Sequence, residues 1–530
     1  NKDLLKPLLR PYICNCVIAH ALKTFLMSFD WTAILVPLSI ILMVVYAVCL
    51  ILIFLYALSQ LSLLLNYIRQ KNKTGQDPVF DLKNPKEVPF VTIQLPIYNE
   101  LYVIERLLDY VSEIEYPQEK IEVQVLDDST DESVLITAKK IAALCAAGHN
   151  IIHLRRSNRE GFKAGALKEG LKSAKGEFVA IFDADFTPKK DWLLQTIPYF
   201  KNEKIGVVQT RWGHINRNYS ILTKVQAFAL DMHFTLEQVG RNYGGHFMNF
   251  NGTAGVWRKA CIEDAGNWEG DTLTEDLDLS YRAQLKGWKF KYLEDVETPA
   301  ELPVVISAIR SQQFRWNKGG AENFQKMIGK VFRTPNLGLK TRLHAIMHLL
   351  NSSMFLSVLT LAILSIPMLY IKNEWGHFSW FFNITSLFII STVIFFVCYW
   401  FTYKRIHGSG FINFIEFSKN FVTFYAIAMG FSVHNSKAVL EGHRGKRSEF
   451  VRTPKFNLSK FKDNFKSNKY LQKNISKNTL LESFLMVYFL FGMTSAFFVG
   501  TEGDFGLFPF HLLLFIGFGF VAYSSIKSKM

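Results

Sequence analysis

An apolar run from Trp31 to Leu65 carries no charged residue and requires a long helix that is buried or lipid-facing. About 20 apolar residues cross the hydrocarbon core of a bilayer, so the run predicts a transmembrane helix over residues 31–68. Basic residues follow it directly, and the positive-inside rule places them in the cytoplasm. No short apolar segment with a cleavage pattern is evident, so we expect an anchor rather than a removed signal peptide. Residues 1–30 mix apolar and basic side chains, which is typical of an interfacial helix.

Comparable apolar runs return only after residue 338, and the intervening stretch is long enough for one domain. The later runs predict two transmembrane helices within residues 342–403 and two within 480–525. Residues 411–440 are apolar but carry charges, and we expect them to form helices on the cytoplasmic face. The charge rule then places the domain and the basic region 441–478 in the cytoplasm. The sequence therefore predicts a multi-pass integral membrane protein.

The charge balance supports this organisation. There are 60 Lys and Arg against 45 Asp and Glu, a net charge of +15. The excess lies mainly beside the apolar runs, and no nucleic-acid-binding motif occurs. We therefore expect a lipid bilayer, and not a nucleic acid, as the partner of these charges. A hydrophobic content of 49% excludes a disordered chain, while 20% charged residues exceed what a chain lying mostly within a bilayer would carry.

The polar stretch, residues 80–335, alternates between strand and helix patterns. Short buried runs predict strands at residues 90–95, 121–126, 151–154 and 177–182, and helical spacing fills the gaps between them. This alternation is typical of an α/β domain with a mostly parallel sheet. Ligands bind such sheets outside the carboxyl ends of the strands.

Two acidic clusters fall at that edge of the predicted sheet. Asp127 and Asp128 end one strand, and Asp183 and Asp185 end another. Two carboxylates that flank a small residue can hold one divalent cation, which prefers oxygen ligands. Asp127 and Asp128 could instead cap the helix that follows, since Asp side chains satisfy free amide groups there.

Two further motifs follow along the chain. Glu275 and Asp276 could supply a general base, or could be the acidic first turn of a helix. Gln312-x-x-Arg315-Trp316 pairs an Arg suited to phosphate oxygens with a Trp suited to the face of a sugar. The alternative is an amphipathic helix that packs Trp316 inward.

Together and in this order, the motifs resemble those of processive, membrane-embedded family 2 glycosyltransferases. The chain is similar to cellulose synthases, and closer to plant cellulose-synthase-like mannan and glucan backbone synthases and their bacterial relatives. Residues 250–258 (FNGTAGVWR) look like the acceptor-side loop of that group. Residues 450–455 (FVRTPK) resemble its FxVTxK gating loop, with Arg452 in place of the usual Val.

The resemblance implies a Rossmann-like GT-A fold for the cytoplasmic domain, joined to an α-helical transmembrane bundle, and Mg²⁺ or Mn²⁺ as the cofactor. Asp183 and Asp185 would hold the metal, and Asp276, beside Glu275, would be the general base. The implied residues for the nucleotide sugar and the acceptor end are Asp127, Asp128, Lys163, Asp183, Gln312, Arg315 and Trp316. The implied gating-loop residues are Phe450, Thr453 and Lys455.

The function implied is inverting transfer of a sugar from UDP-glucose or GDP-mannose to a growing β-linked polysaccharide, with translocation of the chain across the membrane. A bacterial enzyme of this kind would lie in the plasma membrane. The alternatives are a non-processive glycosyltransferase that makes a glycolipid, and a transporter or receptor with a soluble domain. The sequence leaves the donor sugar, the linkage and the accessory subunits open.

Overall fold

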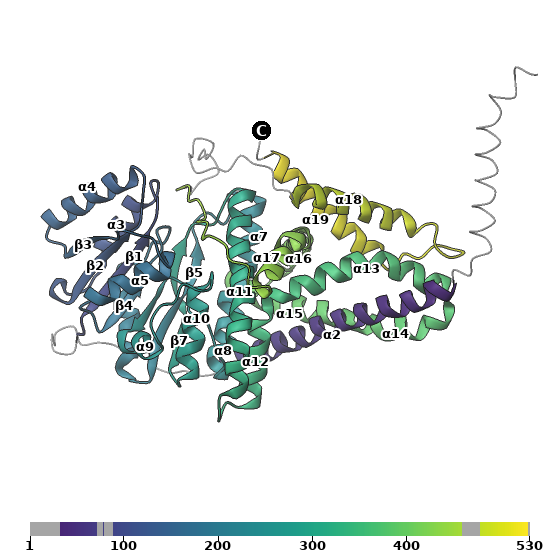
Figure 1. Ribbon diagram of the computed structural model, residues 1–530, viewed down its shortest axis with the longest axis horizontal. Coiled ribbons are helices and arrows are strands. Elements are labelled where there is room, and N and C mark those ends of the chain that lie inside the picture. The colour runs from purple at the N-terminus through teal and green to yellow at the C-terminus, as the bar shows by residue number, and fades with distance from the viewer. Residues whose placement is uncertain (1–31, 71–77, 79–87, 458–477, 528–530) are drawn as a thin grey trace, which may run out of the picture.

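A computed structural model describes residues 32–70, 78, 88–457 and 478–527. The expected interfacial segment 1–30 lies outside the described residues. So do residues 458–477, which form the larger part of the basic region 441–478. A domain built on a β-sheet occupies one end of the molecule, and long helices extend from it to the other end (Figure 1). The division predicted from the apolar runs is therefore visible in the structure.

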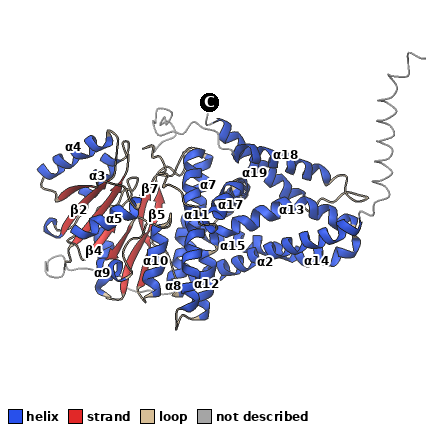
Figure 2. Ribbon diagram, viewed as in Figure 1, coloured by secondary structure: helices blue, strands red, loops and turns tan. Residues whose placement is uncertain are grey.

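The sheet has seven strands in the order β3-β2-β1-β4-β6-β5-β7 (Figure 2). All neighbouring pairs are parallel except those of β6, which is antiparallel to both β4 and β5. The prediction of a mostly parallel sheet is confirmed. The strands are β1 (Val91–Ile97), β2 (Ile121–Asp127), β3 (Ile151–Arg155), β4 (Phe178–Ile181), β5 (Ile205–His214), β6 (Gly255–Arg258) and β7 (Lys289–Ala300).

Apolar layers cover both faces of the sheet. Along β4, Phe178 and Ala180 face one layer while Val179 and Ile181 face the other, as alternation along a strand requires. The first layer is packed by α3 and α4, and the second by α5 and α10. The helices of this domain are α3 (Ile104–Ser112), α4 (Ser133–Ala146), α5 (Phe162–Ser173), α6 (Trp192–Thr196), α9 (Lys259–Asp264) and α10 (Glu275–Leu285).

A second group of helices lies between the sheet and the bundle. One continuous stretch comprises α7 (Ile221–Asp231), a π-helical turn (Met232–Glu237) and α8 (Gln238–Gly244). The 28-residue α11 (Ile306–Arg333) carries the Gln-x-x-Arg-Trp motif, and α12 (Leu339–Leu349) follows it. Helix α17 (Ser432–His443) packs so closely along α11 that a Cβ added at Gly442 would lie 2.6 Å from the carbonyl oxygen of Lys318.

The bundle consists of helices from both halves of the sequence (Figure 1). They are α2 (Thr32–Gln70), α13 (Met354–Glu374), α14 (Ser379–Ser386), α15 (Ile390–His407), α16 (Phe411–Gly430), α18 (Asn478–Ser495) and α19 (Phe508–Lys527). Four described stretches are long and apolar enough to cross a membrane, namely Ala33–Gln70, Asn351–Glu374, Gly376–His407 and Phe508–Lys527. They correspond to four of the five predicted transmembrane helices. The fifth predicted transmembrane helix corresponds to α18. Neither α18 nor α16 is one of the four described stretches that are long and apolar enough to cross a membrane.

One buried ion pair joins the two parts of the molecule. Arg310 on α11 donates to Glu482 on α18 at 2.6 Å and to Ser525 on α19 at 2.8 Å. The Glu482 side chain is fully buried and that of Arg310 is 7% exposed. Loss of one partner of a buried pair leaves an uncompensated charge and costs about 3–5 kcal/mol. The contact therefore fixes α11 against the C-terminal helical hairpin.

Candidate active site

A cleft opens at the carboxyl ends of the central strands. Its first cavity, of about 630 Å³, is lined by residues that follow β1, β2 and β4, among them Tyr98, Asp128 and Asp183. A second cavity of about 760 Å³ adjoins it and is lined by Asp276, Gln312 and Trp316, among others. Residues that line both are Lys163, Asp183, Asp185, Arg315, Phe450 and Lys455. The predicted motifs thus meet at one edge of the sheet.

The two residues of the first acidic pair, Asp127 and Asp128, have different surroundings. Asp127 is fully buried and lies behind the cavity wall, where its Oδ1 accepts from the Ser129 N–H and its Oδ2 lies 2.8 Å from His153 Nε2. Although burial alone would raise the pKa of Asp127, the hydrogen bonds from His153 and Ser129 hold it below its usual value. Asp128 does line the cavity, and Arg156 Nε donates to it at 2.9 Å. Asp127 therefore secures the turn that presents Asp128.

The Asp-x-Asp carboxylates face two ammonium groups. Lys163 Nζ donates to Asp183 Oδ1 at 2.5 Å, and Lys455 Nζ lies 2.6 Å from Asp185 Oδ2. The other oxygen of Asp185, Oδ1, is buried and has no hydrogen-bond partner in the described part of the chain. A buried carboxylate oxygen without a donor suits a hard cation. Asp183 and Asp185 therefore fit the divalent metal that was predicted for them.

Asp276 lies at the start of α10, beside the Asp-x-Asp pair. The backbone at Gly252 passes so close that an added Cβ would lie 3.0 Å from Asp276 Oδ2, and its φ of +81° also favours glycine. Desolvation, followed by the neighbouring charge of Glu275, raises the pKa of Asp276 to about 7. Burial also raises the pKa of Glu275. A carboxylate with a pKa near 7 is well matched to a general base at neutral pH.

The Gln-x-x-Arg-Trp motif reaches the cleft from α11. Gln312 and Trp316 line the second cavity, whereas Arg315 lies between the two. Arg315 Nη2 donates to Thr453 Oγ1 at 2.8 Å, and its guanidinium lies 4.6 Å from the centre of the Phe450 ring. The motif therefore contacts residues 450–455, the segment that resembles a gating loop.

Residues 450–455 are docked in the cleft. Phe450 stacks on Phe162, with ring centres 5.8 Å apart. Arg452 Nη1 lies 2.8 Å from Glu100 Oε2, so the residue that departs from the family pattern makes its own ion pair. Glu100 lines the first cavity, and burial raises its pKa to about 7 against the opposing effect of Arg452.

Several residues of this site were not predicted from the sequence. Glu100 follows the end of β1 and so lies at the same edge as the predicted aspartates; its position after a strand was the signal. Arg156 and Arg159 likewise follow β3, and Arg159 lies over the Tyr98 ring, 3.4 Å from its centre. His233 and Gln238 form hydrogen bonds with Asn251 of the segment 250–258, and no sequence pattern pointed to them.

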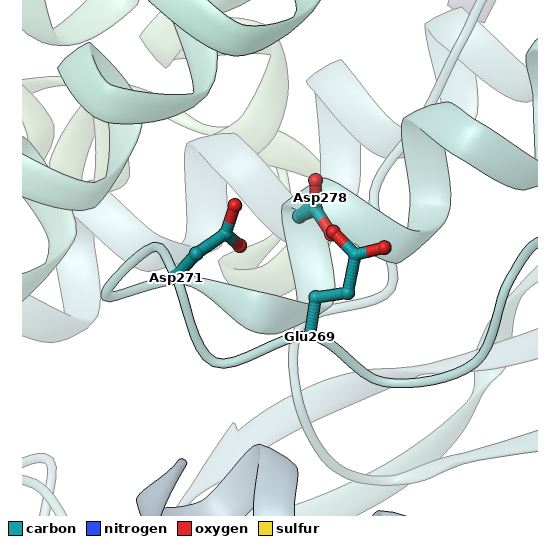
Figure 3. Close-up of side chains that lie close together, drawn as sticks. All are labelled: Glu269, Asp271 and Asp278. Carbon is teal, nitrogen blue, oxygen red and sulfur yellow. The ribbon is translucent and has the colours of Figure 1, made fainter.

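A second acidic cluster lies outside the cleft. Glu269, Asp271 and Asp278 converge closely enough to hold a cation (Figure 3). The ammonium of Lys326, on α11, already fills this position, with distances of 2.6, 2.8 and 2.9 Å to the three carboxylates. The cluster is therefore an ionic junction between α11 and the sheet domain rather than a metal site.

The sheet domain matches a known protein family. Residues 89–319 match the family described as "Glycosyltransferase like family 2". The chain therefore carries a glycosyltransferase family 2 domain with a GT-A-like mixed sheet, and the predicted resemblance is confirmed.

Its curated relatives include plant cellulose-synthase-like proteins. Glucomannan 4-beta-mannosyltransferase 1 of Oryza sativa subsp. japonica is 44% identical over 266 residues, which are 49% of this chain and 50% of that protein. Glucomannan 4-beta-mannosyltransferase 1 of Cyamopsis tetragonoloba is 39% identical over 323 residues, 59% of this chain and 61% of that protein. The chain thus spans about half the length of the curated relatives that it matches. Among solved structures, the mannosyltransferase PcManGT from Pyrobaculum calidifontis, in complex with GDP-Man and Mn²⁺, is 19% identical, with a TM-score of 0.48 over 77% of this chain and all of that chain.

Proposed function

We propose that the protein is a membrane-embedded, inverting glycosyltransferase that extends a β-linked mannan or glucan backbone from a nucleotide sugar. The observation that carries this proposal is the arrangement in the cleft. Asp276, with its pKa raised to about 7, lines the same cavity as the Asp183–Asp185 pair and Arg315. The plant relatives are named as 4-beta-mannosyltransferases, which favours mannose as the sugar.

In this mechanism the nucleotide sugar lies in the first cavity and the end of the acceptor chain lies in the second. Asp276 takes the proton of an acceptor hydroxyl while the oxygen of that hydroxyl attacks the anomeric carbon of the donor sugar. The bond from that carbon to the diphosphate breaks, and attack from the opposite face inverts the configuration. Arg315 and Lys455 lie between the cavities, where their positive charges can neutralise the departing diphosphate.

Asp183 and Asp185 would hold Mg²⁺ or Mn²⁺. A bound divalent cation supplies neutralisation of negative charge on the diphosphate. Binding of the cation would affect the two lysines differently. Lys163 can remain between Asp183 and the Gly252 carbonyl, to which it donates at 3.0 Å. Lys455, on the gating loop, would exchange its contact with Asp185 for the diphosphate oxygens.

The helical bundle suits the export of the product. A polysaccharide is too polar to cross hydrocarbon unaided, so a synthase must provide a path through the membrane. Helix α11 carries Trp316 to the second cavity and is held to α18 and α19 by Arg310. We therefore place the catalytic domain on the cytoplasmic side, with the growing chain leaving the second cavity towards the bundle.

The test uses the full chain purified in a bilayer mimic. It is incubated with labelled GDP-mannose or UDP-glucose and with Mg²⁺ or Mn²⁺, and the product is digested with linkage-specific hydrolases. We expect a polymer that a β-1,4-mannanase or β-1,4-glucanase degrades. A single sugar attached to a lipid would support the non-processive alternative, and no turnover of any nucleotide sugar would refute the proposal.

A further inference from the structure

A polar relay connects the π-helical turn to the acceptor-side cavity. Such turns are rare in proteins, but those that occur are often found at functional sites. Here the turn Met232–Glu237 places His233 and Glu237 close together, with His233 Nδ1 2.9 Å from Glu237 Oε2. The other ring nitrogen, Nε2, lies 2.9 Å from the side-chain amide nitrogen of Asn251. Asn251 lines the second cavity.

The partners in the relay determine which atoms donate. Burial alone would raise the pKa of Glu237, but Arg241 and His233 lower it to about 2, so this side chain is an ionised acceptor. His233 must then carry its proton on Nδ1, which leaves Nε2 to accept from the Asn251 amide. Gln238 Nε2 donates to Asn251 Oδ1 at 2.6 Å and thereby fixes the other end of that amide.

Asn251 directly precedes the residue that approaches the proposed general base. The Asn251 backbone N–H donates to Gln209 Oε1 at 3.0 Å, and the following residue, Gly252, is the one that closely approaches Asp276. An Asn side chain has two N–H groups. His233 takes one of them, and the other can serve a ligand in the cavity.

We propose that His233 is a positioning residue that orients Asn251, so that its second amide N–H donates to a hydroxyl oxygen of the acceptor sugar beside the hydroxyl that Asp276 deprotonates. This role rests on the proposed function. A site built to donate to a hydroxyl discriminates strongly against acceptors that lack it, because its own polar group is then left without a partner.

The test measures acceptor and donor kinetics separately. The purified full chain is given the donor that it turns over and β-1,4-mannotriose as the acceptor probe. In His233→Phe and Asn251→Ala we expect the KM for the acceptor to rise about tenfold, the loss expected for one hydrogen bond. In His233→Phe the KM for the donor and the rate of donor hydrolysis by water should stay within about twofold of the parent values. His233→Gln can still accept through its amide oxygen and should restore the acceptor KM to within about threefold.

The matched control is His443→Phe. His443 also makes two side-chain hydrogen bonds, to Gln325 and Ser353, but does not line either cavity. It should leave the acceptor KM unchanged. An unchanged acceptor KM in His233→Phe, or a donor hydrolysis rate that falls in parallel with transfer, would overturn the positioning role. A parent chain that neither hydrolyses nor transfers any nucleotide sugar would instead refute the proposed function, and this role with it.

Discussion

Replacement of Arg452 by Met is expected to weaken the docking of residues 450–456 in the cleft. In the docked loop the Arg452 and Glu100 side chains are only 11% and 10% exposed, and their charged atoms are 2.8 Å apart. At pH 8 most of Glu100 is ionised, because its pKa is about 7. Without the guanidinium this pKa rises further, and the carboxyl group takes up a proton instead of remaining as a buried, unpaired charge.

The loss includes that of one ion pair between two largely buried groups, which we take as about 1.5–3 kcal/mol. Since 1.4 kcal/mol changes an equilibrium tenfold, the ratio of docked to undocked loop should fall by about 10- to 150-fold. The remaining contacts, Thr453 with Arg315 and Lys455 with Asp185, are unchanged by the substitution. They should keep the loop partly docked.

Hydrogen exchange measures this ratio directly. The backbone N–H of Phe456 donates to Glu301 Oε1 at 2.9 Å, so its protection reports on docking. In the full chain, Arg452→Met should speed exchange at this amide by the same 10- to 150-fold. Arg447→Met, which removes an exposed Arg from the same segment, is the matched control. Equal protection of this amide in the parent and in Arg452→Met, or equal loss of protection in both variants, would refute the role of the Arg452–Glu100 ion pair in docking.

Four further outcomes follow from the site and its surroundings. Asp276→Asn should lower the transfer rate by about 10²- to 10⁴-fold with an unchanged melting temperature, and full activity would exclude Asp276 as the base. Since a base acts in its deprotonated form, transfer by the parent should rise as the pH increases through about 7, and a flat profile from pH 5 to 9 would contradict the assignment. Asp185→Asn should raise the Mn²⁺ concentration needed for half-maximal transfer by about tenfold or more, measured against a fixed donor concentration. Lys326→Met should lower the melting temperature by several degrees, because three carboxylates lose their shared cation; restoration by Mn²⁺ would show that the cluster can bind a metal after all.

Local patterns predicted those parts of the site that depend on strand ends. Asp183 and Asp185 directly follow β4, and Asp128 follows β2, so the sheet alone brings them together. The same principle would have led to Glu100 after β1. The helices that are long and apolar enough to cross a membrane were likewise visible in the sequence as long apolar runs.

Contacts between distant segments could not be predicted in this way. Glu100 and Arg452 are separated by more than three hundred residues, and nothing near either residue specifies the other. The π-helical turn packs against α2 and α15, which lie far from it in the sequence, whereas the sequence around His233 has ordinary helical spacing. Lys326 was equally hidden, since a Lys on an amphipathic helix usually faces solvent.

The ion pair between Arg310 and Glu482 has a practical consequence. A fragment that ends with the catalytic domain would retain Arg310 at the start of α11 but lose both of its partners, Glu482 and Ser525. The buried guanidinium and the apolar side of α11 would then face water. Efforts to obtain a soluble catalytic fragment should therefore either replace Arg310 and its apolar neighbours together or keep the C-terminal hairpin attached.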